Sequence, residues 1–356
     1  MSVLFSPITL RGLTVPNRVW LSAMCQYSAD DGVPTDWHLV HLGARAVGGF
    51  GLLLTEATAV TAAGRGSRRD TGLYTDAQVA GWRRVVGFAH GQGTLIGVQL
   101  GHAGRKSSAR VPWEGSGSLP AAEGGWTAAA PSALPFGDLA VPRELTVDEI
   151  ADIVRAFGEA AGRAVDAGFD VVEIHAGHGY LAHQFLSPLS NRRTDGYGGS
   201  FDHRVRFLRE VVRAVRGRWP DDRPLLVRLS ATDWVDGGWT PADTTVLAGL
   251  LATDGADLVD VSSGGLDPRQ LITVGPGYQV PFAREVRSAG VPVGAVGLIT
   301  DPRQAEAVVA GGSADVVLLA RAALREPSWP LRAAHELGVP AGALPYPEQY
   351  LRGVWR

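Results

Sequence analysis

The chain of 356 residues is poor in two reactive side chains, since it contains one cysteine, Cys25, and one lysine, Lys106. A single cysteine forms no internal disulfide, no cysteine-rich zinc site and no cysteine-ligated iron–sulfur cluster. A Schiff-base aldolase or a pyridoxal-phosphate enzyme would have to use Lys106. The sequence also lacks the G-x-G-x-x-G dinucleotide motif and the G-x-x-x-x-G-K-[ST] phosphate loop, which disfavours both of the corresponding nucleotide-binding folds.

An excess of one charge and long apolar runs are missing as well. The 33 basic and 36 acidic residues give a formal charge of −3, so no basic field indicates nucleic acid or an anionic membrane as a partner. The N-terminus has no signal-peptide pattern, and no apolar run approaches the length of a membrane span. With 45% hydrophobic residues, the chain should fold around a sizeable core. We therefore expect a cytoplasmic protein with neither membrane nor nucleic acid as a partner.

From residue 19 onward, short β-rich apolar runs alternate with amphipathic helical stretches. The runs have the length and composition of parallel strands covered on both faces. They span residues 19–23, 52–55, 95–99, 171–175, 225–229, 258–261, 293–296 and 316–319. Eight such units predict an α/β protein of the (β/α)₈ TIM-barrel type, and a doubly wound open sheet is the competing fold.

Two helices are defined by their ends. Thr146 and Glu149 form a capping box, and Gly168 is a plausible stop for the helix that follows. A second helix begins at Ser200 and ends before Pro220.

Two segments depart from the alternation. Residues 101–145, after the third strand, are rich in Gly, Pro, Ser and Ala, and a connection of this length is usually functional. We expect residues 1–356 to form a single barrel domain, in which residues 101–145 cap the active-site face. The tail 340–356 has no strand pattern, and it is either a contact between subunits or a simple surface anchor.

Polar side chains end three of the predicted strands. Because residues two apart in a strand share a face, Gln99, His175 and Arg228 should point into the barrel at its mouth. A buried arginine requires an anion or a strong acceptor. For Arg228 that partner is either an internal carboxylate, Glu173 or Asp260, or a bound ligand.

Residues 175–180 place His175, His178 and Tyr180 within six positions at a strand end. Two imidazoles can donate hydrogen bonds to one carbonyl oxygen, and a phenol can deliver a proton nearby. The alternatives are satisfied core histidines or a His-x-x-His metal site, and the latter lacks a third ligand. We therefore predict a catalytic cluster and no metal.

A phosphate site is indicated after the last two strands. Barrels often bind phosphate with these loops, and here they contain Gly297, Ala320 and Arg321. Gly297 would permit a close backbone approach and Arg321 would supply a bidentate cation. For either segment alone, a turn glycine or a surface arginine would be the better interpretation.

Several sequence blocks occur in a characteristic order along nearly the whole chain. They are Phe5-Ser6-Pro7, Pro16-Asn17-Arg18, Ser22-Ala23-Met24-Cys25-Gln26-Tyr27, Glu56-Ala57-Thr58, residues 98–105, 175–180, 190–195, 197–200, 227–230 and 261–264, and Arg321. In these blocks the chain resembles the old yellow enzyme family of FMN-dependent ene-reductases. The resemblance is to the thermophilic-like branch, which includes bacterial NADPH dehydrogenases and xenobiotic reductases.

The resemblance implies tightly bound, non-covalent FMN, with NADPH as co-substrate. The residues implied to hold FMN are Ser22, Ala23, Met24, Cys25 and Ala57 at the ring, Gln99 at its pyrimidine edge, Arg228 near N1, and Gly297, Ala320 and Arg321 at the phosphate. His175, His178 and Tyr27 are implied to bind the substrate oxygen, and Tyr180 to donate a proton. Cys25 is implied to tune the reactivity of the flavin; its alternative role is a small buried hydrophobe.

The implied activity is reduction of the activated C=C bond of α,β-unsaturated carbonyl or nitro compounds, in two half-reactions at one site. The resemblance also implies a homodimer or homotetramer, in which Arg352 reaches a neighbouring active site. The competing enzymatic hypothesis is a flavin-free barrel lyase or isomerase on a phosphorylated metabolite, with His175 as base. A non-enzymatic binding barrel is a further alternative.

The sequence departs from the family pattern at a few positions. Ala23 stands where relatives often have proline, and Ala320 where many have glycine, so the backbone fit around ring and phosphate could differ. Gly196 replaces a residue that is usually charged.

Overall fold

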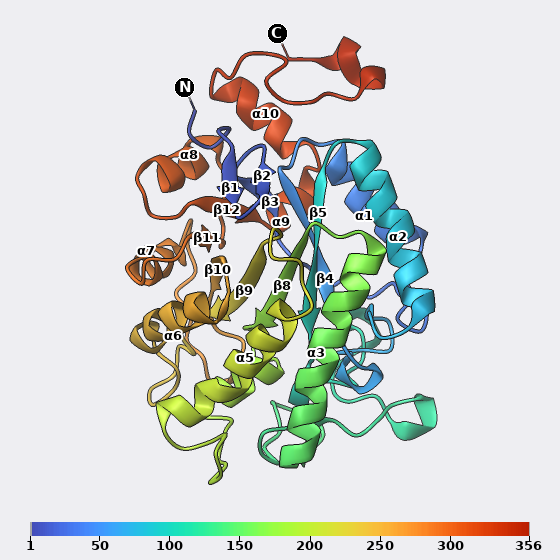
Figure 1. Ribbon diagram of the computed structural model, residues 1–356, viewed down its shortest axis with the longest axis vertical. Helices are drawn as coiled ribbons and strands as arrows, with labels where there is room; N and C mark the ends of the chain where they lie inside the picture. The colour runs from blue at the N-terminus through green and yellow to red at the C-terminus, as the bar shows by residue number, and fades with distance from the viewer. Residues whose placement is uncertain (1, 356) are drawn as a thin grey trace.

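The computed structural model describes residues 2–355, and its centre is a closed barrel of eight parallel strands (Figure 1). The strands are β3 (Val19–Leu21), β4 (Leu52–Ala59), β5 (Leu95–Gly101), β8 (Val171–Ala176), β9 (Leu225–Ser230), β10 (Leu258–Ser262), β11 (Val293–Ala295) and β12 (Val316–Leu319). They follow the order of the chain around the barrel, and β12 pairs with β3 to close it. This closure confirms the predicted TIM barrel over the open doubly wound sheet.

Helices cover the outside of the barrel (Figure 1). They are α1 (Asp36–Ala46), α2 (Asp76–Gly91), α3 (Val147–Ala167), α4 (Leu181–Leu186), α5 (Phe201–Arg216), α6 (Pro241–Asp254), α7 (Val280–Arg287), α8 (Pro302–Ala310), α9 (Arg321–Arg325) and α10 (Trp329–Glu336). The helix signals read from the sequence are confirmed. Thr146 caps α3 in a capping box, Gly168 ends it at φ +90°, and Ser200 caps α5.

Apolar side chains pack on both sides of the sheet. Residues such as Val172 and Val227 face the helices and belong to the large core between the barrel and its helical shell. A second cluster fills the lower interior of the barrel, and it includes Trp20, Leu54, Leu226 and Leu318. The hairpin of β1 (Ile8–Leu10) and β2 (Leu13–Val15) contributes Leu10 and Val15 to this plug. This apolar cluster closes one end of the barrel, and the inward-facing polar side chains Gln99, Glu173, His175 and Arg228 lie on the side of it toward the carboxyl ends of the strands.

Strand ends differ slightly from the predicted ranges. The strand predicted for 19–23 ends at Leu21, because after Ser22 donates its N–H to the carbonyl of Leu319 the chain leaves the barrel wall. β4 extends to Ala59 through an irregularity between Leu54 and Ala57. The 101–145 segment contains β6 (Ala129–Ala130), β7 (Arg143–Glu144) and short 3₁₀ turns.

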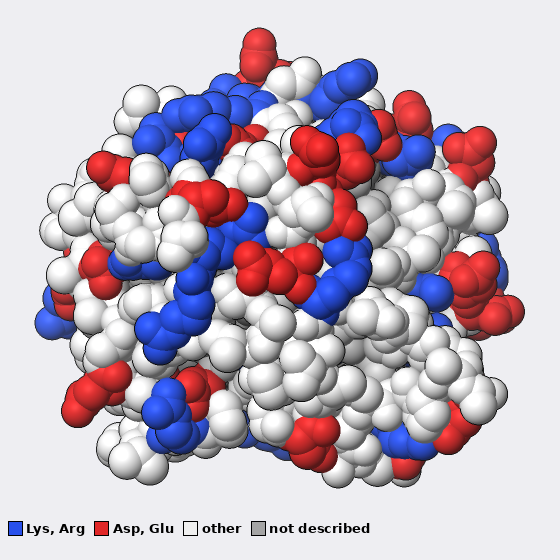
Figure 2. All heavy atoms as spheres, turned by 90° about the horizontal axis from the view of Figure 1, so that it is seen from below, with Lys and Arg blue, Asp and Glu red and all other residues white. Residues whose placement is uncertain are grey.

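The 101–145 segment and the C-terminal tail lie at opposite ends of the barrel (Figure 1). The end with the 101–145 segment carries acidic and basic side chains interspersed, without a broad field of one sign (Figure 2). The tail, beside α10, contains the 3₁₀ turn Glu348–Gly353. Within residues 2–355, no helix combines the length and the apolar character that crossing a bilayer requires.

Candidate active site

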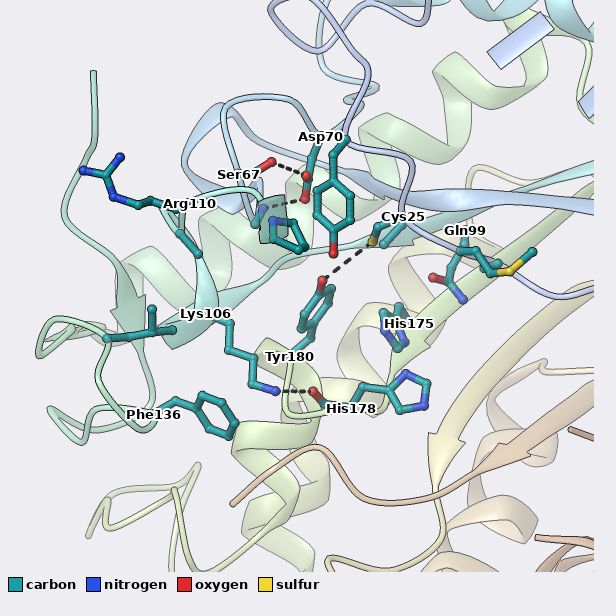
Figure 3. Close-up of a pocket in the computed structure, with 18 of the residues that line it drawn as sticks. Cys25, Ser67, Asp70, Gln99, Lys106, Arg110, Phe136, His175, His178 and Tyr180 are labelled. Atoms are coloured by element: carbon teal, nitrogen blue, oxygen red, sulfur yellow. Dashed lines mark hydrogen bonds between the residues drawn. The ribbon is translucent and has the colours of Figure 1, made fainter. Parts of the chain in front are cut away.

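A cavity of about 530 Å³ opens at the carboxyl ends of the strands (Figure 3). Most of the residues predicted for the flavin ring and the substrate line it. These are Ala23, Met24, Cys25, Tyr27, Ala57, Gln99, His175, His178, Tyr180 and Arg228. Ser22 does not line the cavity but accepts a hydrogen bond from Arg228 at 2.8 Å. Arg352 is not part of this cavity.

Arg228 and Gln99 form a polar floor. The guanidinium of Arg228 lies 3.2 Å from the carboxylate of Asp260, so Asp260, not Glu173, is its ion-pair partner. Gln99 donates from Nε2 to Oε1 of Glu173 at 2.6 Å. The internal ion pair expected for Arg228 is thus present; Arg228 also lines the cavity, and its contact with a bound ligand stays a prediction.

His175 and His178 are brought together at the end of β8, with ring centroids 5.2 Å apart. Burial first, and Arg228 second, lowers the pKa of both imidazoles well below 6.5, so both are neutral at pH 7. His178 has a φ of +53°, and its N–H bonds Ser230 Oγ at 2.9 Å. Its Nε2 lies 2.7 Å from Ser262 Oγ. Each neutral ring keeps one N–H to donate.

Tyr180 stands against His175, with a centroid distance of 4.8 Å, and its hydroxyl is 3.9 Å from the Cys25 sulfur (Figure 3). The charge interaction with Cys25, followed by burial and Asp70, raises the pKa of Tyr180 well above 10. Burial, reinforced by nearby carboxylates, also raises the pKa of the Cys25 thiol. Tyr180 is therefore a protonated phenol at neutral pH, and Cys25 is a thiol rather than a thiolate. Tyr27 packs edge-on against Trp113 of the 101–145 segment at 5.6 Å.

Lys106 and Asp70 line the same cavity, and the sequence analysis did not assign them to it. Lys106 donates to the carbonyl oxygens of His178, at 2.8 Å, and Gly265, and its ammonium lies 3.9 Å from the centre of the Phe136 ring. Burial, with Arg105 nearby, lowers its pKa to about 7. Burial raises the pKa of Asp70 to about 7 as well. Lys106 could have been singled out from the sequence, because it is the only lysine and it lies in the long 101–145 segment.

A second, smaller cavity of about 130 Å³ contains the predicted phosphate residues Gly297, Ala320 and Arg321. Gly297 has a φ of +119°, which a side chain would strain, and a Cβ at this position would lie 2.7 Å from the side-chain amide of Gln279. Ala320, which precedes α9, has a φ of −105° and a ψ of −96°, so its φ lies outside the left-handed region that favours glycine. Arg321 is exposed, and within residues 2–355 it forms no ion pair.

The two cavities adjoin. Ser262 lines the smaller cavity, and its hydroxyl contacts His178, which lines the larger one. Together they present a wide space with a polar floor, small side chains at Ala23 and Ala57, and a pocket lined by Gly297 and Arg321. This donor set matches a planar heterocycle that bears a phosphate. The residues present therefore fit FMN.

A closed (β/α)₈ barrel with these two adjoining cavities at the carboxyl ends of its strands defines the class of flavin-binding barrel oxidoreductases. Residues 3–339 match the NADH:flavin oxidoreductase / NADH oxidase family. The chain is 50% identical over 359 residues to an NADPH dehydrogenase of Geobacillus thermodenitrificans, covering 100% of this chain and 99% of that protein.

Solved structures give the same result. Morphinone reductase in complex with tetrahydroNAD has a TM-score of 0.79 at 32% identity, with 95% of this chain and 91% of that chain covered. The old yellow enzyme homologue from Zymomonas mobilis has a TM-score of 0.79 at 28% identity, with coverage of 95% and 93%. The chain belongs to the NADH:flavin oxidoreductase family, that is, to the old yellow enzymes.

Membership confirms the resemblance read from the sequence, the oxidoreductase class and FMN with NADPH as cofactor and co-substrate. Membership in this family does not favour the alternative hypothesis of a flavin-free lyase or isomerase.

Proposed function

We propose that the protein uses NADPH to reduce the activated C=C bond of α,β-unsaturated carbonyl or nitro compounds. One observation carries this proposal: two neutral imidazoles and a protonated phenol line one cavity above the Gln99 and Arg228 floor. Reduction of such an alkene needs two hydrogen-bond donors for the activating oxygen and a general acid that protonates a carbon. It also needs a hydride donor next to the double bond.

FMN supplies that hydride when it is bound, after it has accepted one from NADPH. Gln99 and Arg228 would hold the pyrimidine edge of the flavin, and the guanidinium would supply a fixed positive charge that stabilises the reduced ring. Arg321 and the backbone at Gly297 and Ala320 would hold the phosphate. Ala23, Met24, Cys25 and Ala57 would form the surface for the ring, and Ser22 would support it by holding Arg228 through their hydrogen bond.

His175 and His178 bind the substrate oxygen through their N–H groups. This polarisation draws electron density away from the β-carbon, which becomes the acceptor of the hydride. Tyr180 then gives its proton to the α-carbon, so that a hydride and a proton add across the double bond while NADPH becomes NADP⁺. Tyr27 adds a contact to the substrate, and Cys25 adjusts the environment of the ring.

An anaerobic titration tests this function. NADPH added to the FMN-loaded protein is expected to bleach the visible flavin band, and cyclohexenone admitted afterwards is expected to restore it with one enone consumed per NADPH. A buffer addition in place of the enone is the control and should leave the band bleached. Bleaching without recovery for any enone or nitroalkene would contradict the proposed substrate class, and the absence of a bound flavin would contradict the whole proposal.

We propose further that the protein is a homo-oligomer in which Arg352 enters the active site of a neighbouring copy. Arg352 lies outside the cavity of its own chain, and the tail sits at the other end of the barrel. The tail is anchored by stacking of Trp355 on His335 at 5.3 Å, while Tyr350 and Leu351 are 54% and 58% exposed. Exposed apolar side chains beside an exposed arginine fit a contact with a second copy.

A truncation that removes the tail from Tyr350 onward should therefore disturb oligomerisation and, at the same time, raise the KM for the enone. Arg352→Ala keeps the apolar contacts, so it should raise the KM without changing the mass measured by light scattering. Unchanged KM values in both variants would remove Arg352 from the site, and unchanged mass in the truncated chain would remove the tail from the interface.

A further inference from the structure

Three charged side chains from adjacent strands are buried inside the barrel, at the cavity floor and just below it. They are Glu173 on β8, Arg228 on β9 and Asp260 on β10, with exposed fractions of 0%, 5% and 0%. The apolar plug that contains Leu226 and Leu258 lies beneath them. This arrangement puts two carboxyl groups and one cation into a dry interior.

The hydrogen bonds of this cluster are incomplete. Oε2 of Glu173 and both carboxylate oxygens of Asp260 are buried without a hydrogen-bond donor among the described residues, although Arg228 Nε lies 3.2 Å from Asp260. Two ionised carboxylates beside one guanidinium would leave a net negative charge in an apolar interior. Such a charge is costly, and carboxyl groups in this situation share a proton. The count of charges therefore requires one bound proton.

The geometry assigns that proton to Glu173. Arg228 and Asp260 are direct partners in the register of β9 and β10, so Asp260 has the cation beside it. Glu173 has the neutral amide of Gln99 as its hydrogen-bond partner. In agreement, burial and then the charge of Asp260 raise the pKa of Glu173 to about 8. On its own strand the next inward residue is His175, which is neutral.

We propose that Glu173 is a proton-binding site coupled to the oxidation state of the flavin, which takes up one proton when the flavin is reduced and releases it when the flavin is reoxidised. The inference rests on the proposed function, which places the pyrimidine edge on Gln99 and Arg228. Both residues line the cavity and also contact the buried carboxyl groups: Gln99 bonds Glu173, and Arg228 pairs with Asp260.

The coupling is electrostatic. Hydride from NADPH brings two electrons and leaves a negative charge on the ring edge above Arg228. That charge offsets the cation which otherwise favours an ionised Glu173, so the acid binds its proton more tightly. Above the pKa of Glu173 in the oxidised protein, reduction therefore adds one solvent proton to the carboxylate. When the hydride passes to the substrate, the negative charge leaves the ring and the proton returns to solvent.

The midpoint potential of the FMN-loaded protein, measured against pH by spectroelectrochemistry, tests this coupling. Two electrons with one proton give a slope of about 30 mV per pH unit, and a second proton doubles it to about 60 mV. We expect the wild-type slope to steepen above about pH 8, where Glu173 is ionised in the oxidised protein. Glu173→Gln should keep the shallow slope throughout. Redox-difference infrared spectra above pH 8 should show a protonated carboxyl band on reduction that this variant lacks.

Two other groups at the cavity titrate in the same range and serve as controls. Asp70 and Lys106 both have a pKa of about 7. Asp70→Asn and Lys106→Met should retain the steepening if Glu173 is the proton site. Loss of the steepening in either of these variants, with its retention in Glu173→Gln, overturns the proposal.

Asp260→Asn provides a second variant in case Glu173→Gln does not fold. Without the negative charge of Asp260, Arg228 acts on Glu173 alone and lowers its pKa, so the steep region should begin about one pH unit lower or more. If the steep region begins at the same pH in Asp260→Asn as in the wild type, the proposal is overturned. Protein that binds FMN and consumes NADPH with enones, but shows a constant shallow slope, contradicts this inference alone; protein without FMN contradicts the proposed function.

Discussion

Arg228→Met is expected to lose flavin and a large part of its stability. The substitution leaves Asp260, which is 0% exposed, inside the barrel with no cation. Breaking a buried pair by removal of one partner costs about 3–5 kcal/mol, because the remaining charge is uncompensated. Urea unfolding should therefore show a lower midpoint with a similar slope, and the purified protein should be colourless.

The double variant Arg228→Met with Asp260→Asn separates these two effects. It removes the stranded carboxylate, so most of the lost stability should return, while flavin affinity should stay low because the cation is still absent. Asp260→Asn alone serves as the reference for the coupling energy. Retention of FMN by the single variant would contradict the assignment of Arg228 to the cofactor.

The alternation of side chains along strands predicted much of this site. Val172 and Ile174 belong to the core under the helices, and so the inward positions of Glu173 and His175 followed from a period of two. The same argument placed Arg228 inward. The closed parallel barrel then brought the strand ends to a single mouth, which the sequence had indicated by its eight alternating units.

The partner of Arg228 could not be chosen from the sequence. Periodicity tells which side a residue faces, whereas its height in the barrel depends on strand register. In the structure, Arg228 is level with Asp260 on β10 and with His175 on β8, while Glu173 is level with Leu226. The ion pair with Asp260 and the separation of Glu173 follow from that register.

The structure of the 101–145 segment could not be predicted from the sequence either. Residues 101–145 have no dominant periodicity, and the contact of Lys106 with His178 joins positions 72 residues apart. Asp70 is held by Ser67 and by the backbone of Gly66, in a turn that no strand or helix signal marks. Such contacts depend on how loops fold over a completed barrel.

Tyr180→Phe is expected to slow alkene reduction about 10²-fold or more, because a positioned general acid contributes at least this factor. The substitution keeps the ring that packs on His175 at 4.8 Å and removes only the hydroxyl. Reduction of the flavin by NADPH needs no proton at a substrate carbon, so its rate should be unchanged. Stopped-flow measurement of the two half-reactions separates these effects.

Tyr27→Phe is the matched control, since it removes a hydroxyl from the same cavity but not the one beside Cys25. It should raise the KM with a smaller effect on the rate of the alkene step. Because the pKa of Tyr180 is raised well above 10, the phenol stays protonated through pH 9, and the wild-type alkene step should not fall in alkaline buffer from loss of this acid. Equal losses in both half-reactions of Tyr180→Phe would mean that the residue positions ligands rather than donating a proton.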